Sequence, residues 1–230
     1  MIKRPVLRLA LGVTLATASA AAMADAQTGW YFGLSGGQAQ VDIDQDEFDA
    51  LVEDTFASVG FPLISGSSSL EDSDTSFAAY GGYRFSQYFA VEGSFIDFGT
   101  AEYRASGNVN PPGPTVSIPA SYSAEFEVFG FTAASVGTLP LGQMFDLHGR
   151  LGVMFADTEI SENAMVATAS ADETYSANTQ EIFYGIGAGL RLGERWALSL
   201  DWHQYKDVGD EDDTGETDVD RISLGVTFKL

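Results

Sequence analysis

The stretch Trp196-Ala197-Leu198-Ser199-Leu200-Asp201-Trp202-His203 alternates strictly between two kinds of side chain. Large apolar residues occupy every second position, and small or polar residues stand between them. A period of two residues is typical of a β-strand, in which successive side chains point to opposite faces of a sheet. One face of this strand is therefore apolar, and the other is small and polar.

Seven further segments show the same period, so the sequence predicts eight strands. They lie at about 28–42, 76–86, 89–106, 121–136, 143–160, 180–192, 195–209 and 220–230. Short connections at 86–88, 136–142 and 193–194 alternate with longer polar loops at about 43–75, 107–120, 161–179 and 210–219. An even number of strands joined alternately by short turns and long loops is typical of barrels that cross the bacterial outer membrane.

One face of each predicted strand is almost free of charge. The residues on it are Trp30, Phe32, Leu34; Phe77, Ala79, Tyr83, Phe85; Phe89, Val91, Phe95; Tyr122, Ala124, Phe126, Val128; Phe145, Leu147, Leu151, Val153, Phe155; Ile182, Tyr184, Ile186, Leu190; Trp196, Leu198, Leu200, Trp202; and Ile222, Leu224, Val226, Phe228, Leu230. The pattern alone also fits a periplasmic sandwich or a lipocalin-like barrel. Eight strands, however, close into a barrel that has no exposed edge and whose interior is just filled by side chains. We therefore expect an all-β fold: an eight-stranded antiparallel up-and-down transmembrane β-barrel.

The opposite face would then line the lumen of the barrel. Its charged and imidazole residues are Arg84, Glu92, Glu125, Glu127, Asp146, His148, Arg150, Arg191, Asp201, His203, Arg221 and Lys229. This register predicts five acidic side chains opposite five basic ones. We expect Arg84, Glu92, Arg150, Arg191, Asp201 and Lys229 to form an ion-pair network.

The first 24 residues are typical of a signal peptide. Lys3, Arg4 and Arg8 precede the apolar run 9–18, and small residues flank a cleavage site in Ala22-Met23-Ala24. We expect residues 1–24 to be removed and residues 25–230 to form one barrel domain. Loss of three basic residues takes the formal charge from -22 to -25, which disfavours nucleic acid as a partner. Cysteine is absent.

Several segments resemble the OmpA/OmpX-type family of eight-stranded outer-membrane barrels. They are Tyr80-Gly81-Gly82-Tyr83-Arg84-Phe85 with the following 87–93, His148-Gly149-Arg150-Leu151-Gly152, and the closing 223–230. The resemblance implies an outer-membrane location. It also implies that Ser223, Gly225, Phe228 and Leu230 form the C-terminal signal read by the assembly machinery. Leu230 departs from the aromatic residue that is usual at the last position.

Enzymatic and metal-binding interpretations are weaker than a structural one. Ser199, Asp201 and His203 are the residue types of a hydrolase triad, but same-face neighbours on one strand stand roughly 6.5 Å apart. Asp42, Asp44, Asp46 and Glu53 fall at EF-hand positions, although Glu47 replaces the required glycine. Asp210 and Asp212 belong to a second acidic loop. We expect no enzyme activity and no cofactor beyond loosely bound divalent cations.

The first long loop offers two interpretations. Phe48, Leu51, Val52, Phe56 and Val59 have the spacing of a short amphipathic helix over the barrel mouth, and an irregular loop is an equal alternative.

The sequence therefore predicts a structural and surface-interaction barrel that supports envelope integrity and displays acidic loops. The alternative is a narrow channel for ions or small solutes, and a lipid-modifying outer-membrane enzyme is a third hypothesis. The expected partners are outer-membrane lipids, lipopolysaccharide, the assembly machinery and an unidentified extracellular ligand.

Overall fold

The computed structural model describes residues 28–42, 45–110, 116–210 and 215–230. It contains nine strands and one helix, in the order β1 (Gly29–Val41), α1 (Gln45–Ser58), β2 (Leu63–Glu71), β3 (Ser73–Ser86), β4 (Phe89–Val109), β5 (Ile118–Leu141), β6 (Phe145–Val166), β7 (Ala169–Leu192), β8 (Trp196–Asp210) and β9 (Gly215–Lys229). The predicted signal peptide, Asp44 and Asp212 lie outside the described residues.

Eight of the strands form a closed ring. Antiparallel neighbours follow the order β4-β3-β1-β9-β8-β7-β6-β5, and β5 pairs with β4 to close the circle. The first and last strands of the chain meet closely, since a Cβ on Gly37 would lie 1.9 Å from the carbonyl oxygen of Ile222. The ninth strand, β2, pairs only with β4, beyond the end of β3. The predicted eight-stranded antiparallel barrel is confirmed.

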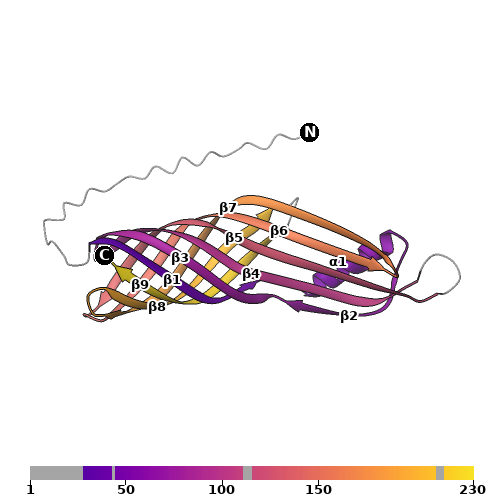
Figure 1. The fold of residues 1–230 in the computed structure, drawn as a ribbon, viewed down its shortest axis with the longest axis horizontal. Helices are drawn as coiled ribbons and strands as arrows, with labels where there is room; N and C mark the ends of the chain where they lie inside the picture. Colours follow the sequence, from indigo (N-terminus) through magenta and orange to yellow (C-terminus); the bar gives the residue numbers. More distant parts are fainter. Residues whose placement is uncertain (1–27, 43–44, 111–115, 211–214) are drawn as a thin grey trace, which may run out of the picture.

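The two ends of the barrel differ (Figure 1). The turn end carries the tight connections β3–β4, β5–β6 and β7–β8 together with the C-terminus. The helix end carries α1 and β2, and there β4, β5, β6 and β7 run on past the other strands. Among the described residues, no helix is long and apolar enough to cross a membrane.

The outer wall near the turn end is apolar. Leu34, Ile222 and Leu224 expose 68%, 59% and 69% of their surface, and they occupy two neighbouring strands, β1 and β9. Uncharged outward rows of this kind continue around the ring. They consist of the predicted residues on every strand of the ring except β5. A wall so apolar fits the hydrocarbon of a bilayer.

On β5 the predicted faces are exchanged. Tyr122, Ala124, Phe126 and Val128 point into the barrel, whereas Glu125 and Glu127 are exposed on the outside. The outward lipid row of this strand is the lower one, which contains Phe129, Phe131 and Leu139. Residues 118–128 belong to the helix end, where water replaces lipid outside and α1 fills the inside. In residues 121–128 the apolar side chains therefore point inward and the charged ones outward, so the predicted orientation of this segment was wrong.

The predicted loops are largely ordered structure. Residues 161–179 form the ends of β6 and β7 around a turn at 167–168, residues 107–109 and 118–120 belong to β4 and β5, and residues 43–75 contain α1 and β2. In the last predicted loop, β9 already begins at Gly215. The strands are longer than expected because the sheet continues beyond the bilayer.

This boundary can be tested with two arginine substitutions. Leu200→Arg on the lipid-facing wall should lower the free energy of unfolding by about 2–4 kcal/mol, because it places a charge near the middle of the bilayer. Ser123→Arg, on the outer face of β5 at the helix end, should change it by about 0.5 kcal/mol or less. Urea titration of the barrel folded into lipid vesicles measures both. Equal costs would contradict the boundary.

Candidate functional site

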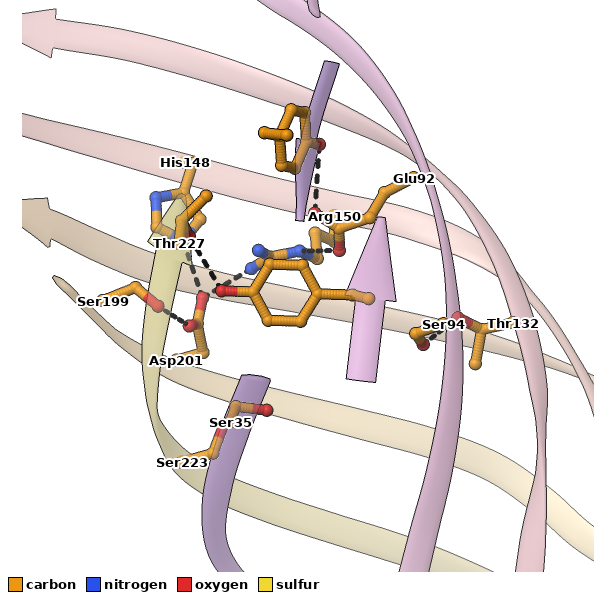
Figure 2. A network of polar contacts seen from close by, with 12 residues as sticks. Ser35, Glu92, Ser94, Thr132, His148, Arg150, Ser199, Asp201, Ser223 and Thr227 are labelled. Atoms are coloured by element: carbon orange, nitrogen blue, oxygen red, sulfur yellow. Dashed lines mark hydrogen bonds and ion pairs between the residues drawn. The ribbon is translucent and has the colours of Figure 1, made fainter. Parts of the chain in front are cut away.

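Arg150 is the centre of the lumen near the turn end. Its Nε donates to Glu92 Oε1 at 2.9 Å and its Nη1 donates to Asp201 Oδ1 at 2.5 Å. Figure 2 shows the guanidinium lying between the two carboxylates, which come from β4 and β8. All three side chains are about nine-tenths buried. The second oxygens are also used, because Tyr31 donates to Glu92 Oε2 at 3.1 Å and Ser199 donates to Asp201 Oδ2 at 2.6 Å.

A second group of charges adjoins Arg150. His148 Nε2 lies 2.6 Å from Asp201 Oδ1, and its Nδ1 lies 3.2 Å from Asp146 Oδ1. Arg191 Nε lies 3.4 Å from the other oxygen of Asp146. The contacts require Gly187, where a Cβ would lie 2.3 Å from Asp201 and 2.5 Å from His148. We call Glu92, Asp146, His148, Arg150, Arg191 and Asp201 the lumen network.

The other two predicted members lie at the margin of this network. Arg84 donates to the hydroxyl of Thr138 at 3.2 Å and lies 5.8 Å from the centre of the Tyr31 ring. Lys229 is half-buried near the turn end and pairs across the barrel seam with Tyr31 of β1. Of the predicted members, the structure therefore brings Glu92, Arg150, Arg191 and Asp201 into the lumen network, whereas Arg84 contacts Thr138 and Tyr31.

The hydrolase triad is not assembled. Ser199 hydrogen-bonds to Asp201, but His203 Nδ1 has no hydrogen-bond partner among the described residues. A general base that does not contact the nucleophile cannot activate it. The geometry thus gives no support to an enzyme that uses His203.

Above the lumen network the interior becomes apolar. Phe98 and Phe183 pack against Tyr205 with ring centres 4.8 and 5.0 Å apart. We call this cluster the plug; it consists of Ile96, Phe98, Met154, Phe183, Tyr205, Val208 and Val219, all at most 3% exposed. An ion that crossed this apolar layer would lose its hydration shell and would find no polar groups to replace the water.

At the helix end, α1 is held inside the extended sheet. Val52 and Phe56 pack with Tyr103 and Val109 in a second buried cluster. Asp49 fixes the helix, because its two carboxylate oxygens accept hydrogen bonds from Tyr103 at 2.5 Å and from Ser68 at 2.9 Å. The predicted amphipathic helix is confirmed, and it binds to the wall of the sheet.

The outer face of the same sheet is acidic. Aligned positions on β4, β5 and β6 pair Glu102 with Glu125 and Glu127 with Glu159. We call the following residues the acidic band: Asp97, Glu102, Glu125, Glu127, Asp157 and Glu159. Arg104 forms an ion pair with Glu102 at its edge. Glu125 and Glu127 were expected in the lumen and instead belong to this exposed surface.

The predicted metal ligands do not form a site among the described residues. Asp46 and Glu53 are both on α1, so residues 45–53, which an EF-hand would need as part of its loop, are helical here. Asp42 precedes the helix, and Asp210 is the last residue of β8. No group of three or more histidine, aspartate or glutamate side chains in the described ranges is arranged to hold a metal ion.

The C-terminal segment forms β9. Phe228 packs outward on Trp196 with ring centres 4.8 Å apart, and Leu230 is 71% exposed beyond the strand. Ser223 and Gly225 face the lumen, where Ser223 accepts a hydrogen bond from Arg221. Outward apolar side chains at the turn end are accessible to an assembly factor, which remains a prediction.

Sequence reasoning missed the plug, Asp49 and Ser68. The inward position of Ile96, Phe98 and Phe183 could have been found from their parity relative to Glu92 and Arg191. Nothing in the sequence pairs Asp49 with Tyr103, which is 54 residues away.

Comparison with protein families gives a match over residues 25–230 to the family described as OmpA-like transmembrane domain. Comparison with curated protein sequences finds no match. Similar solved structures include Neisserial surface protein A, with 11% identity, a TM-score of 0.46, and coverage of 87% of this chain and 97% of that chain. The Ail protein of Yersinia pestis has 15% identity and a TM-score of 0.45, with coverage of 87% and 98%. The N-terminal barrel of Pseudomonas aeruginosa OprF has 11% identity and a TM-score of 0.44, with coverage of 89% and 100%.

The importance of Arg150 can be measured by removing its charge. Arg150→Met should destabilise the folded barrel by about 3–5 kcal/mol, because it leaves two buried carboxylates without their cation. Arg84→Met removes a hydrogen bond to a hydroxyl and a contact with the Tyr31 ring, and it should cost about 1 kcal/mol. Urea titrations of the two variants provide the comparison, and a smaller cost for Arg150→Met would refute the network as described.

The attachment of α1 should depend on the phenol of Tyr103. Burial, reinforced by the hydrogen bond to Asp49 and its charge, raises the pKa of Tyr103 to about 12 from its ordinary 10.0. A raised pKa means that the neutral phenol is favoured in the folded state, so its contribution is complete below about pH 10 and is lost as the pH rises through about 12. Tyr103→Phe should produce the same release at neutral pH.

Chymotrypsin cleavage within α1, measured on the folded barrel, reports this attachment. Tyr103→Phe should accelerate cleavage several-fold, while Asp54→Asn, an exposed position on the same helix, should not. Cleavage rates that are equal in both variants would mean that the Tyr103–Asp49 hydrogen bond does not hold the helix.

Proposed function

Because the chain belongs to the OmpA-like transmembrane domain family, whose barrels lie in the outer membrane, we propose that it is a surface-interaction protein that presents a folded acidic sheet outside the cell. The observation that carries the proposal is the reversal of polarity along β5, from outward Phe129 and Phe131 to outward Glu125 and Glu127. Beyond the lipid boundary the chain continues as a sheet whose inner face packs on α1. The acidic, solvent-exposed face of this sheet points outward.

The shape of this sheet favours contact with another macromolecule. β2, β4, β5, β6 and β7 form five adjacent strands at the helix end. β7 pairs with β8 only as far as Phe183, so residues 169–182 have no strand beside them among the described residues on that side. An uncovered edge of this length can pair with an extended segment of a partner.

The charge of the sheet selects the kind of partner. The acidic band contains six carboxylates, and within it Arg104 pairs with Glu102. Such a surface attracts basic proteins and peptides and repels anionic ones. Along β5 the band also adjoins the outward phenylalanines. We infer from this that the band lies near the lipid headgroups, where divalent cations would link its carboxylates to phosphates. A contribution to envelope integrity through lipopolysaccharide is the second part of this proposal.

A conducting channel is the weaker candidate. The lumen network is charged and could in principle rearrange, but the plug lies above it with seven side chains at most 3% exposed. Opening a water path would require the aromatic side chains of the plug to leave their packed positions. We therefore expect the barrel to be closed. A planar bilayer that contains the protein should show no single-channel conductance.

Two matched triple variants distinguish the effect of the acidic band from the effect of removing three negative charges elsewhere on the protein. Glu125→Gln, Glu127→Gln and Glu159→Gln together remove three charges from the band. Asp46→Asn, Glu53→Gln and Asp54→Asn remove three exposed charges from α1. Binding of a fluorescent octalysine peptide is measured on barrels in phosphatidylcholine vesicles at low salt. The band variant should bind at least threefold more weakly than the α1 variant, and equal losses would count against a surface specific to the sheet.

A further inference from the structure

Arg221 is a buried cation whose hydrogen-bond partners in the described part of the chain are all neutral. It is 2% exposed on β9, between the lumen network and the plug. Its Nε donates to Ser76 at 2.8 Å, its Nη1 to Ser223 at 2.8 Å and its Nη2 to Ser35 at 3.0 Å. None of the ion pairs found within the described residues includes Arg221. A guanidinium has five N–H donors, so two remain for another acceptor.

Two carboxylates of the lumen network, Glu92 and Asp201, line the same cavity as Arg221 and are bonded to other groups. Asp201 accepts from His148, Arg150 and Ser199. Glu92 accepts from Arg150 and Tyr31. Each of their oxygens already accepts a buried hydrogen bond from another group, and neither carboxylate is bonded to Arg221 in the part of the chain that the structure describes.

A small cavity borders the Arg221 side chain. Its volume is about 30 Å³, enough for roughly two water-sized particles. The residues that line it are Ser35, Ala78, Tyr80, Glu92, Ser94, Ile96, Thr132, Arg150, Phe183, Asp201, His203, Tyr205, Arg221 and Ser223. Ser35 and Ser223 appear below the lumen network in Figure 2, near Asp201.

His203 provides a further unused polar atom at this cavity. It is 6% exposed, and its Nδ1 has no hydrogen-bond partner among the described residues. Its imidazole lies directly opposite Arg221 across the β8–β9 pair. In the tautomer that carries the Nδ1 proton, the ring donates a hydrogen bond and adds to the donors of Arg221.

The section of the lumen from the network up to Arg221 has more arginines than carboxylates. From the network up to Arg221, the inward arginines are Arg84, Arg150, Arg191 and Arg221, and the inward carboxylates are Glu92, Asp146 and Asp201. Both ring nitrogens of His148 face carboxylates, which is the arrangement of an imidazolium with two N–H donors. At least one negative charge is therefore needed for neutrality in a region of low dielectric constant.

We propose that a halide-sized monovalent anion occupies the cavity between Arg221 and His203 as a structural ligand of the folded barrel. Water alone would satisfy hydrogen bonds but not the charge of Arg221. The cavity is too small for an oxoanion of five heavy atoms such as sulfate or phosphate. Hydroxyl groups and a guanidinium are suitable donors for chloride, which accepts several hydrogen bonds at once.

The anion should enter while the barrel folds. The plug covers the cavity toward the helix end, and the lumen network covers it toward the turn end. Because the cavity lies between these two layers of the interior, the anion is supplied during refolding.

Bromide is the probe that tests this site. The wild-type protein is refolded and crystallised with sodium bromide as the only halide, and anomalous diffraction is recorded at the bromine edge. We expect one interior peak in the cavity within hydrogen-bonding distance of Arg221. Arg221→Met should lose the peak, and Arg84→Met should keep it. A wild-type cavity with no anomalous signal, or with density for water only, would overturn the proposal.

A second measurement is made in solution and does not depend on crystals. The urea midpoint of wild-type barrel refolded in sodium bromide or chloride is compared with that in sodium gluconate at the same ionic strength, because gluconate is too large for the cavity. Both halides should shift the midpoint upward, and Arg84→Met should retain the shift. Identical midpoints in the three salts would reject the anion as a structural ligand.

Discussion

The need to satisfy every backbone hydrogen bond in the absence of water determines this structure. Within hydrocarbon an unpaired N–H or C=O group costs several kcal/mol, so a sheet can cross a bilayer only if its edges meet. Here β1 and β9 meet at Gly37 and Ile222, and β4 and β5 complete the ring. Outside the bilayer the requirement no longer applies. Among the described strands, the open edges of β2 and β7 lie at the helix end, beyond the bilayer.

The same boundary explains the distribution of side chains. Within the bilayer the wall is apolar and the interior carries charges, which are paired around Arg150 or enclosed below the plug. Beyond the bilayer the wall carries the acidic band, and the interior is filled by α1. Two apolar layers therefore lie above the ionic interior of the turn end, first the plug and then the α1 cluster. Each layer excludes water from what lies beneath it and favours a closed barrel.

The sequence was sufficient for the barrel and for most of its register, because stretches such as 196–202 alternate without interruption in the part that faces lipid. It was insufficient for β5. There Tyr122 and Phe126 have the appearance of a lipid row, but they lie above the boundary, where apolar side chains point inward. Alternation identifies a strand and its two faces. Which face points inward depends on whether the segment lies inside or outside the bilayer.

The candidate site could likewise be predicted only in part. Glu92, Arg150 and Asp201 could be assigned to one lumen by parity, yet their contact depends on the stagger of β4, β6 and β8, which no local pattern determines. The isolation of Arg221 was equally hidden. In the predicted register Glu125 and Glu127 balanced the charge of the lumen as a whole, whereas the structure places them on the outer face and leaves an excess of arginines around Arg221.

The most direct test of a sheet that continues across the lipid boundary is a spin-label scan along β5, in which residues 119–139 are labelled one at a time and their exposure to oxygen and to a water-soluble nickel complex is measured in vesicles. We expect labels at Phe131 and Ser135 to contact lipid, labels at Ser123 and Glu125 to contact water, and labels at Ala124 and Phe126 to contact neither. The change from lipid to water should fall between Phe129 and Glu127. Lipid contact at Tyr122 and Phe126, or uniformly mobile labels over residues 119–127, would contradict a folded sheet that continues beyond the bilayer.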